Sequence, residues 1–132
     1  MIRCKRVYEA ATADDGCRVL VDRLWPRGCR KDSLGLDTWS REVAPSTEVR
    51  RRFAHDPAHF ADFREAYRSE LAARPELWWG LLEKARQGNL TLLYAARDEQ
   101  LNNARVLAEF LEEELERRQP GSSPVCYADE QG

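Results

Sequence analysis

Several features that mark particular classes of protein are missing from this sequence. No apolar run approaches the length of a membrane-spanning helix, and the longest, Leu90–Ala96, is interrupted by Thr91. No apolar stretch follows the basic segment Met1–Arg6, so we expect no secretory signal, a cytoplasmic location and no contact with a membrane. Phosphate-binding glycine loops, the nucleophile elbow and the HExxH metal motif are missing too, which removes the most recognisable enzyme classes.

Residues that commonly bind metals are also scarce. The four cysteines form no Cys-x-x-Cys pair, and no histidine stands at zinc-finger spacing from them. His55 and His59 are four residues apart, but His55 precedes the helix start at Asp56-Pro57, so the two rings need not share a face. We therefore predict no metal site and no cofactor, and we interpret the cysteines as reduced thiols.

The composition is that of one charged globular domain. The 132 residues include 21 basic and 23 acidic side chains, and 42% of the chain is hydrophobic. The charge is spread unevenly, because residues 18–52 hold nine basic and five acidic residues, whereas residues 98–132 hold three basic and nine acidic residues. The basic segment is either a surface for anions or a solvated face with local ion pairs.

Hydrophobic periodicity predicts buried strands that alternate with helices. Ile2–Glu9 is typical of a short edge strand, whereas Arg18–Trp25 and Leu90–Ala96 are apolar on both faces, as central strands are. Capping residues, prolines and apolar residues three or four apart predict the helices. The expected helices are 37–43, 47–53, one after Asp56-Pro57, one after Pro75, and a long C-terminal helix capped by Asp98.

These elements predict a single α/β domain over residues 1–119, followed by a disordered tail over residues 120–132. The expected architecture is a small, mostly parallel sheet of about three strands in a three-layer arrangement. Helices flank this sheet, and a long C-terminal helix ends the domain. A sheet of this size can be incompletely covered, so we also consider a homodimer.

Charged side chains follow both predicted central strands. Asp22 and Arg23 come at the end of the first strand, and Arg97 and Asp98 follow the second. Parallel strands end at the same edge of a sheet, where ligands bind, so we expect these residues to lie together and, with Arg27, to bind phosphate or carboxylate. Alternatively, Asp22 pairs with an arginine or a loop amide and only holds the fold together. Asp22 and Asp98 are the candidate catalytic residues, although no nucleophile or metal set accompanies them.

The order of the motifs resembles one family. The run Arg18–Gly28, with Cys4–Tyr8 before it and Thr91–Asp98 and Asn102–Ala104 after it, is similar to the YeaO-like family of bacterial proteins, domain of unknown function 488. The resemblance covers nearly all of residues 2–115, and it implies a compact α/β fold without an assigned activity.

The motifs of that family select candidate ligand-binding residues in this chain. Many members have histidine where this chain has Asn103, so the resemblance does not imply an obligatory general base there. The candidate ligand-binding residues are Arg23, Trp25, Arg27, Gly28, Trp39, Ser46, Arg97, Asn102 and Asn103.

Two functions from different classes are consistent with the sequence. In the first, the chain binds, or binds and processes, a small anionic or phosphorylated ligand such as a nucleotide, with the arginines holding its charge. In the second, the chain is a non-catalytic interaction module whose arginines dock nucleic acid or an acidic protein partner. A ligand site should be concave with its arginines turned inward, and a docking face should be convex.

Overall fold

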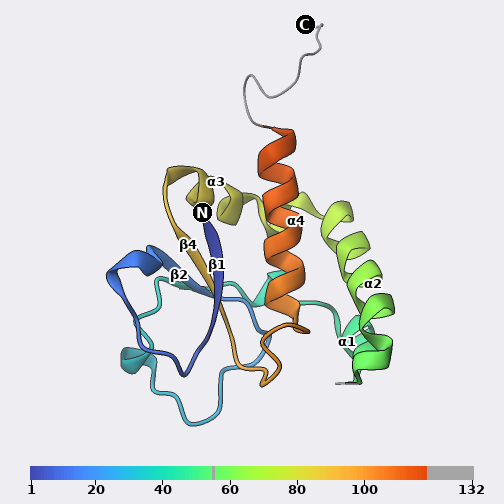
Figure 1. The fold of residues 1–132 in the computed structure, drawn as a ribbon, viewed down its shortest axis with the longest axis horizontal. Helices are drawn as coiled ribbons and strands as arrows, with labels where there is room; N and C mark the ends of the chain where they lie inside the picture. The colour runs from blue at the N-terminus through green and yellow to red at the C-terminus, as the bar shows by residue number, and fades with distance from the viewer. Residues whose placement is uncertain (55, 119–132) are drawn as a thin grey trace, which may run out of the picture.

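The computed structural model describes residues 1–54 and 56–118 of the chain (Figure 1). Residues 120–132, expected to form a tail, and His55 lie outside the described residues. Within the described part, four parallel strands form one sheet and four helices accompany it, which confirms the predicted α/β class and the C-terminal helix. No helix in these residues is long and apolar enough to cross a membrane.

The sheet has its last strand in the middle. The spatial order is β1-β4-β2-β3, and each neighbouring pair is parallel. β4 is buried at every position, and β1 lies at an edge; both placements agree with the predictions. The strands are β1 (Ile2–Arg6), β2 (Cys17–Leu20), β3 (Thr38–Trp39) and β4 (Leu90–Tyr94).

β2 ends sooner than the predicted strand Arg18–Trp25. The amide of Val21 still donates to the carbonyl of Leu93 (3.1 Å), as a ladder residue would. At the next position, however, the side chain of Asp22 accepts from the amide of Ala95 (2.9 Å) in place of a backbone carbonyl. The chain therefore leaves the sheet at Asp22, and the rest of the apolar run belongs to a loop.

The predicted helix over residues 37–43 is wrong. The amides of Asp37 and Ser40 donate to the carbonyls of Arg18 and Leu20 (2.9 Å each), which pairs this segment with β2 as strand β3. Only Arg41–Val43 forms a short 3-10 turn. Pairing with β2 outweighs the local helical preference and adds a fourth strand to the three that were visible in the sequence.

Three helices begin where their caps predict. α1 (Thr47–Phe53) follows Ser46, whose hydroxyl accepts from the amide of Val49 (3.2 Å). α2 (Phe60–Ala73) continues a 3-10 turn capped by Asp56, and α3 (Trp79–Gln87) follows a second turn that opens at Pro75.

The fourth helix begins later than predicted. α4 (Asn103–Arg117) is capped by Asn102, whose side-chain oxygen accepts from the amide of Arg105 (2.9 Å). Asp98 is not the cap, because its carboxylate accepts instead from the amides of Gln100 and Leu101 (2.9 Å each) in the preceding turn.

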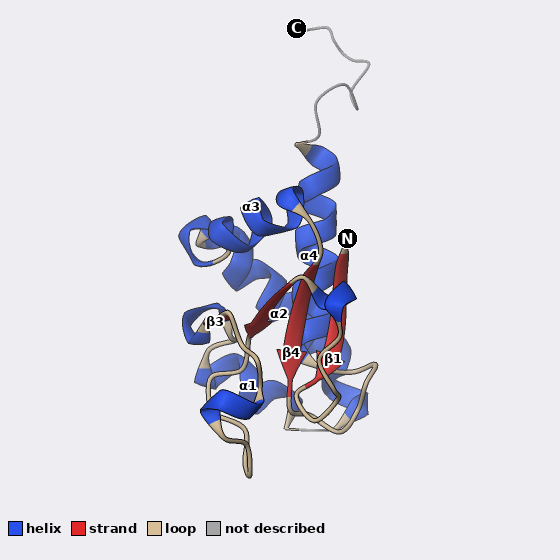
Figure 2. Cartoon of the chain, turned by 90° about the vertical axis from the view of Figure 1, so that its left-hand side faces the viewer, coloured by secondary structure: helices blue, strands red, loops and turns tan. Residues whose placement is uncertain are grey.

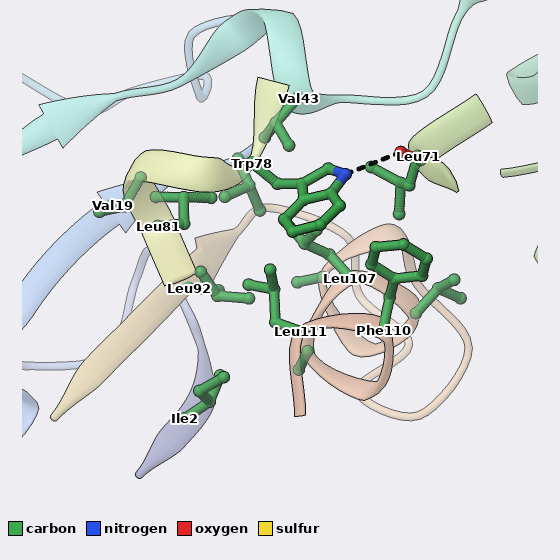
Figure 3. Close-up of a cluster of buried hydrophobic side chains, with 14 of the residues drawn as sticks. Ile2, Val19, Val43, Leu71, Trp78, Leu81, Leu92, Leu107, Phe110 and Leu111 are labelled. Atoms are coloured by element: carbon green, nitrogen blue, oxygen red, sulfur yellow. Dashed lines mark hydrogen bonds between the residues drawn. The ribbon is translucent and has the colours of Figure 1, made fainter. Parts of the chain in front are cut away.

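The helices cover one face of the sheet and form the main core with it. Trp78 lies at the centre of this core, where only 2% of its surface is exposed. Its ring meets Phe110 edge-on with centroids 5.2 Å apart, and its Nε1 donates to the carbonyl of Leu71 at 2.7 Å (Figure 3). Because its single polar atom is satisfied, the large ring contributes its full apolar surface beside Leu92 of β4 and Leu107 of α4.

The opposite face of the sheet is covered by the loop between β2 and β3. Leu20 and Leu93 pack there against Leu34 and against the partly buried Trp25 and Leu36. Loops accordingly lie on one side of the strands and α2 and α4 on the other (Figures 1 and 2). This loop supplies the third layer of the molecule, and its first residues also form the wall of the site described next.

Candidate functional site

A cavity of about 840 Å³ opens where β2 and β4 end. Because these strands are parallel neighbours, the segments that follow them meet at one edge, as predicted. Segments distant in the sequence contribute to the wall. It is lined by Tyr8, residues 22–27, Ala44, Pro45, Thr47, Arg50, Arg51, Phe53, Ala54, Phe63, Ala95, Ala96, Asn102 and Asn103.

Asp22 forms a cross-link at the wall of the cavity. One carboxylate oxygen accepts from the amide of Ala95 (2.9 Å) and the other from Nδ2 of Asn103 (3.1 Å), so the side chain ties the end of β2 to the end of β4 and to the start of α4. Burial raises the pKa of Asp22, against the opposing effects of these two hydrogen bonds and of the positive charge on Arg50. The carboxylate is thus held in place while its charge is only partly compensated.

Four arginines reach this cavity from two elements. Arg23 and Arg27 belong to the loop after β2, and Arg50 and Arg51 belong to α1. Among residues 1–54 and 56–118, none of the four forms an ion pair. With a single carboxylate in the wall, the cavity therefore carries an excess of positive charge.

Arg23 also has an unused donor. Its terminal nitrogen is 3.5 Å from the carbonyl of Pro45, whereas its Nε is buried and has no acceptor among the described residues. A buried N–H without an acceptor is unfavourable, and a ligand oxygen in the cavity would remove that cost.

The predicted site residues divide into two groups. Those that line the cavity are Asp22, Arg23, Trp25, Arg27, Asn102 and Asn103. Those outside its lining are Gly28, Trp39, Ser46, Arg97 and Asp98. Even within the first group, Asn102 is 1% exposed and serves as the cap of α4.

The residues outside the lining have local roles in the fold. Trp39 donates through Nε1 to the carbonyl of Asp22 (2.8 Å) and meets Trp25 edge-on, so it supports the wall from behind. Gly28 has φ +77°, a left-handed conformation that favours glycine, in the loop after β2 and directly after Arg27. Hydrogen bonds from two backbone amides lower the pKa of Asp98, whose carboxylate is exposed in its own turn.

Sequence reasoning missed part of the wall. Tyr8, Leu24, Arg50, Arg51 and Phe53 all line the cavity. Arg50 and Arg51 belong to the basic segment 18–52, so the charge count contained a signal for them. No sequence pattern indicated that α1 would pack beside the loop after β2.

A second polar cluster lies at the opposite end of β2, on the face covered by the loop. Asp15 is fully buried and accepts from Nζ of Lys5 (3.1 Å), from the amide and hydroxyl of Thr12 (3.1 and 2.9 Å) and from the guanidinium of Arg18. Burial alone would raise the pKa of Asp15, but the hydrogen bonds from Thr12, Lys5 and Arg18 outweigh it and hold the pKa well below the usual range. No expectation from the sequence included this cluster.

Comparison with known proteins decides the family. The family profile described as "Inactive DUF488-N3 subclade" matches residues 1–128. The chain belongs to the DUF488 family. Among relatives of the chain, the uncharacterised protein YeaO of Escherichia coli is 48% identical over 110 residues, which cover 83% of this chain and 96% of that protein.

Similar proteins are found in mycobacteria. Uncharacterised proteins of Mycobacterium bovis and Mycobacterium tuberculosis are each 41% identical over 113 residues, which cover 83% of this chain and 92% of theirs. No solved structure matches the chain. These relatives confirm the YeaO-like resemblance inferred from the motifs.

Proposed function

We propose that this chain binds a small anionic ligand, such as a phosphorylated metabolite or a nucleotide, in the cavity at the ends of β2 and β4, and that it does so without catalysing a reaction. The observation that carries the proposal is the presence of four arginines without ion-pair partners in the described residues, all lining one cavity of about 840 Å³. That volume is within the usual range for small-molecule sites, about 300–1,000 Å³.

The arginines elsewhere in the chain supply the contrast. Arg64 and Arg68 of α2 form ion pairs with Glu109 of α4, and Arg117 pairs with Glu114. In these pairs the protein supplies its own counter-charge. In the cavity, Asp22 is the single acidic residue of the described lining, and it forms no ion pair with any of the four arginines. Arginine is well suited to binding an anion, because its planar group holds phosphate or carboxylate through two parallel hydrogen bonds.

Three observations favour binding without catalysis. Both carboxylate oxygens of Asp22 accept hydrogen bonds from the protein, which fixes the side chain as a structural link. Asp98 lies outside the cavity lining, so the two candidate acids do not face a common ligand there. The matching family profile is itself described as inactive.

Concavity favours this proposal over its alternative, a docking module for nucleic acid or an acidic protein. A docking face would present its arginines on a convex surface, whereas these arginines border a hollow. The two functions also differ in salt dependence, since an arginine face on a nucleic acid loses affinity steeply as salt rises.

Calorimetric titration of the full chain with inorganic phosphate, ribose 5-phosphate and a short single-stranded RNA tests the proposal. We expect ribose 5-phosphate to bind, and Arg50→Gln to weaken its binding by about one to two decades, since a charge-assisted hydrogen bond contributes roughly 1.5–3 kcal/mol. Arg52→Gln is the matched control, because Arg52 lies on the same helix but outside the cavity lining.

Binding of the RNA alone, weakened equally by both substitutions, would support the docking module and reject the proposal. A homodimer and a cytoplasmic location stay predictions, which sedimentation of the full chain and localisation of a tagged copy would test.

A further inference from the structure

The cavity wall contains four aromatic side chains, of which one is free to meet a ligand over a large surface. Phe63 is 2% exposed and belongs to the core. Phe53 packs against Phe63 with ring centroids 5.1 Å apart. Trp25 meets Trp39 edge-on at 5.3 Å. Tyr8 differs from all of these, because it lines the cavity and 51% of its surface is exposed.

The ring of Tyr8 is nevertheless held firmly. The guanidinium of Arg6 lies over one face of the ring, 4.9 Å from its centroid. Arg6 is itself fixed, since its Nε donates to the carbonyl of Ala96 (2.9 Å) and its terminal nitrogen to that of Ala95 (3.2 Å), just beyond β4. Arg6 therefore covers one face of the ring, and no other arginine or lysine of residues 1–54 and 56–118 lies over it.

The hydroxyl of Tyr8 adds a second attachment. It donates to the backbone carbonyl of Arg27 at 3.1 Å, across 19 positions of sequence. This bond joins the ring to the backbone of the loop that carries Arg27. The aromatic surface and the loop that supplies two arginines of the cavity are thus held together before any ligand arrives.

We propose that Tyr8 is a stacking platform for a planar ring and that the ligand of the cavity is a nucleoside monophosphate or a similar aromatic phosphate. This inference rests on the proposed function, since it assumes that the arginines hold the anionic group. The phosphate lies against Arg27, Arg50 and Arg51, and the base lies on the uncovered face of Tyr8. Stacking on an aromatic ring tolerates every base, so the platform selects nucleotides over sugar phosphates without selecting one base strongly.

Binding constants for adenosine, cytidine and guanosine monophosphates and for ribose 5-phosphate, measured on the full chain by calorimetry, test the platform. We expect the best nucleotide to bind at least tenfold more tightly than ribose 5-phosphate, because stacking of a base on an aromatic side chain contributes on that scale. Tyr8→Leu should abolish this difference, and because it loses the hydrogen bond to Arg27 just as Tyr8→Phe does, the two variants should bind ribose 5-phosphate alike. Tyr8→Phe keeps the ring and should preserve most of the difference.

Trp79→Leu is the matched control. Trp79 is also partly exposed and also has an arginine over its ring, with Arg118 at 5.0 Å, but it does not line the cavity. Equal affinities for nucleotides and ribose 5-phosphate, unchanged by Tyr8→Leu, would overturn the platform and leave the anion site intact. Failure of every phosphate to bind would reject the anion site and the platform together.

Discussion

The two carboxylates that flank β2 have pKa values shifted in opposite directions. Asp15, just before the strand, is fully buried among Lys5, Arg18 and Thr12, which hold its pKa well below the usual range. Asp22, just after the strand, has its pKa raised by burial and has only two hydrogen bonds from neutral groups. The four residues of β2 therefore lie between two carboxylates that differ in their partners. The charge of Asp15 is balanced by cationic side chains, whereas the charge of Asp22 is only partly balanced.

The difference separates stability from binding. A buried charge with all its partners supplied by the protein is a closed structural unit, and removing one member leaves the others uncompensated. Charges that the protein leaves unpaired, such as Arg23 and Arg27, contribute little to the fold and remain available to a ligand. Both clusters are rich in charge, so the presence of partners, rather than charge itself, distinguishes a structural site from a candidate binding site.

The largest expected effect comes from Asp15→Asn. This change keeps the shape of the side chain but leaves the buried Arg18 without a counter-charge, so we expect the free energy of unfolding to fall by about 3–5 kcal/mol. Urea denaturation of the variant and of Asp14→Asn, an exposed neighbouring control, measures the loss. A loss below about 1 kcal/mol would contradict the structural role assigned to the N-terminal end of β2.

Asp15 and Asp22 should change the stability of the fold with pH in opposite directions. The lowered pKa of Asp15 means that its contribution is present above the ordinary aspartate value, about 3.9, and is lost as the pH falls below it. The raised pKa of Asp22 acts in reverse, because the folded state keeps that proton more readily, so its effect favours folding as the pH falls toward about 4.

Urea denaturation of the wild type, Asp15→Asn and Asp22→Asn from pH 7 to pH 2 resolves the two contributions as difference curves. The Asp15→Asn variant should lose less stability below pH 4 than the wild type does. The Asp22→Asn variant should lack the gain in stability that Asp22 gives the wild type as the pH falls toward 4. Parallel curves for the wild type and Asp22→Asn, separated by a constant offset, would mean that Asp22 has the same pKa in the folded and unfolded states.

At neutral pH, Asp22→Asn should have a moderate effect. The new amide oxygen still accepts from the amide of Ala95, and only the bond with Asn103 is lost, so we expect a loss of about 0.5–1.5 kcal/mol. Asp22→Ala, which removes both acceptors, should cost more. If both variants lose the same amount in thermal denaturation, the cross-link between β2 and β4 does not contribute as described.

The smallest effect is expected for Arg27→Gln. The side chain of Arg27 is exposed and forms no ion pair within residues 1–54 and 56–118, and the bond from Tyr8 uses its backbone carbonyl, so stability should change by less than about 0.5 kcal/mol. Arg18→Gln is the contrasting variant, because it removes an ion-pair partner of the buried Asp15 at the N-terminal end of β2. A loss of several kcal/mol for Arg27→Gln would mean that this arginine has a structural partner after all.

Local signals in the sequence predicted most of the fold. Ser46 and Asp56 mark real caps, and the apolar run at Leu90–Tyr94 is the central strand. The failures occurred where distant pairing overrode local preference. Thr38–Trp39 forms a strand because the neighbouring amides of Asp37 and Ser40 donate to backbone carbonyls of β2. β2 ends at Leu20 because, two residues later, the side chain of Asp22 takes the place of a backbone carbonyl in the pairing with β4.

The candidate site was predictable to the extent that strand order was. Once β2 and β4 are parallel neighbours, the segments that follow them meet at one edge, and the sequence indicated this much for Asp22 and Arg23. Tyr8, Arg50 and Arg51 reach the cavity through the packing of whole segments, which no local pattern encodes. Asn102 shows the reverse case, in which a motif residue proves to be a helix cap.

The position of β4 has a consequence for the order of folding. β1 and β2 do not pair with each other; each pairs with β4, whose first residue, Leu90, lies 88 positions after Ile2. As the chain leaves the ribosome, the first two strands therefore have no central partner until Tyr94 has been made. Pairings between such distant segments form slowly, and strand edges that wait for a partner are prone to aggregation. We therefore expect the newly made N-terminal half to be the part of this chain that is most prone to aggregation during synthesis.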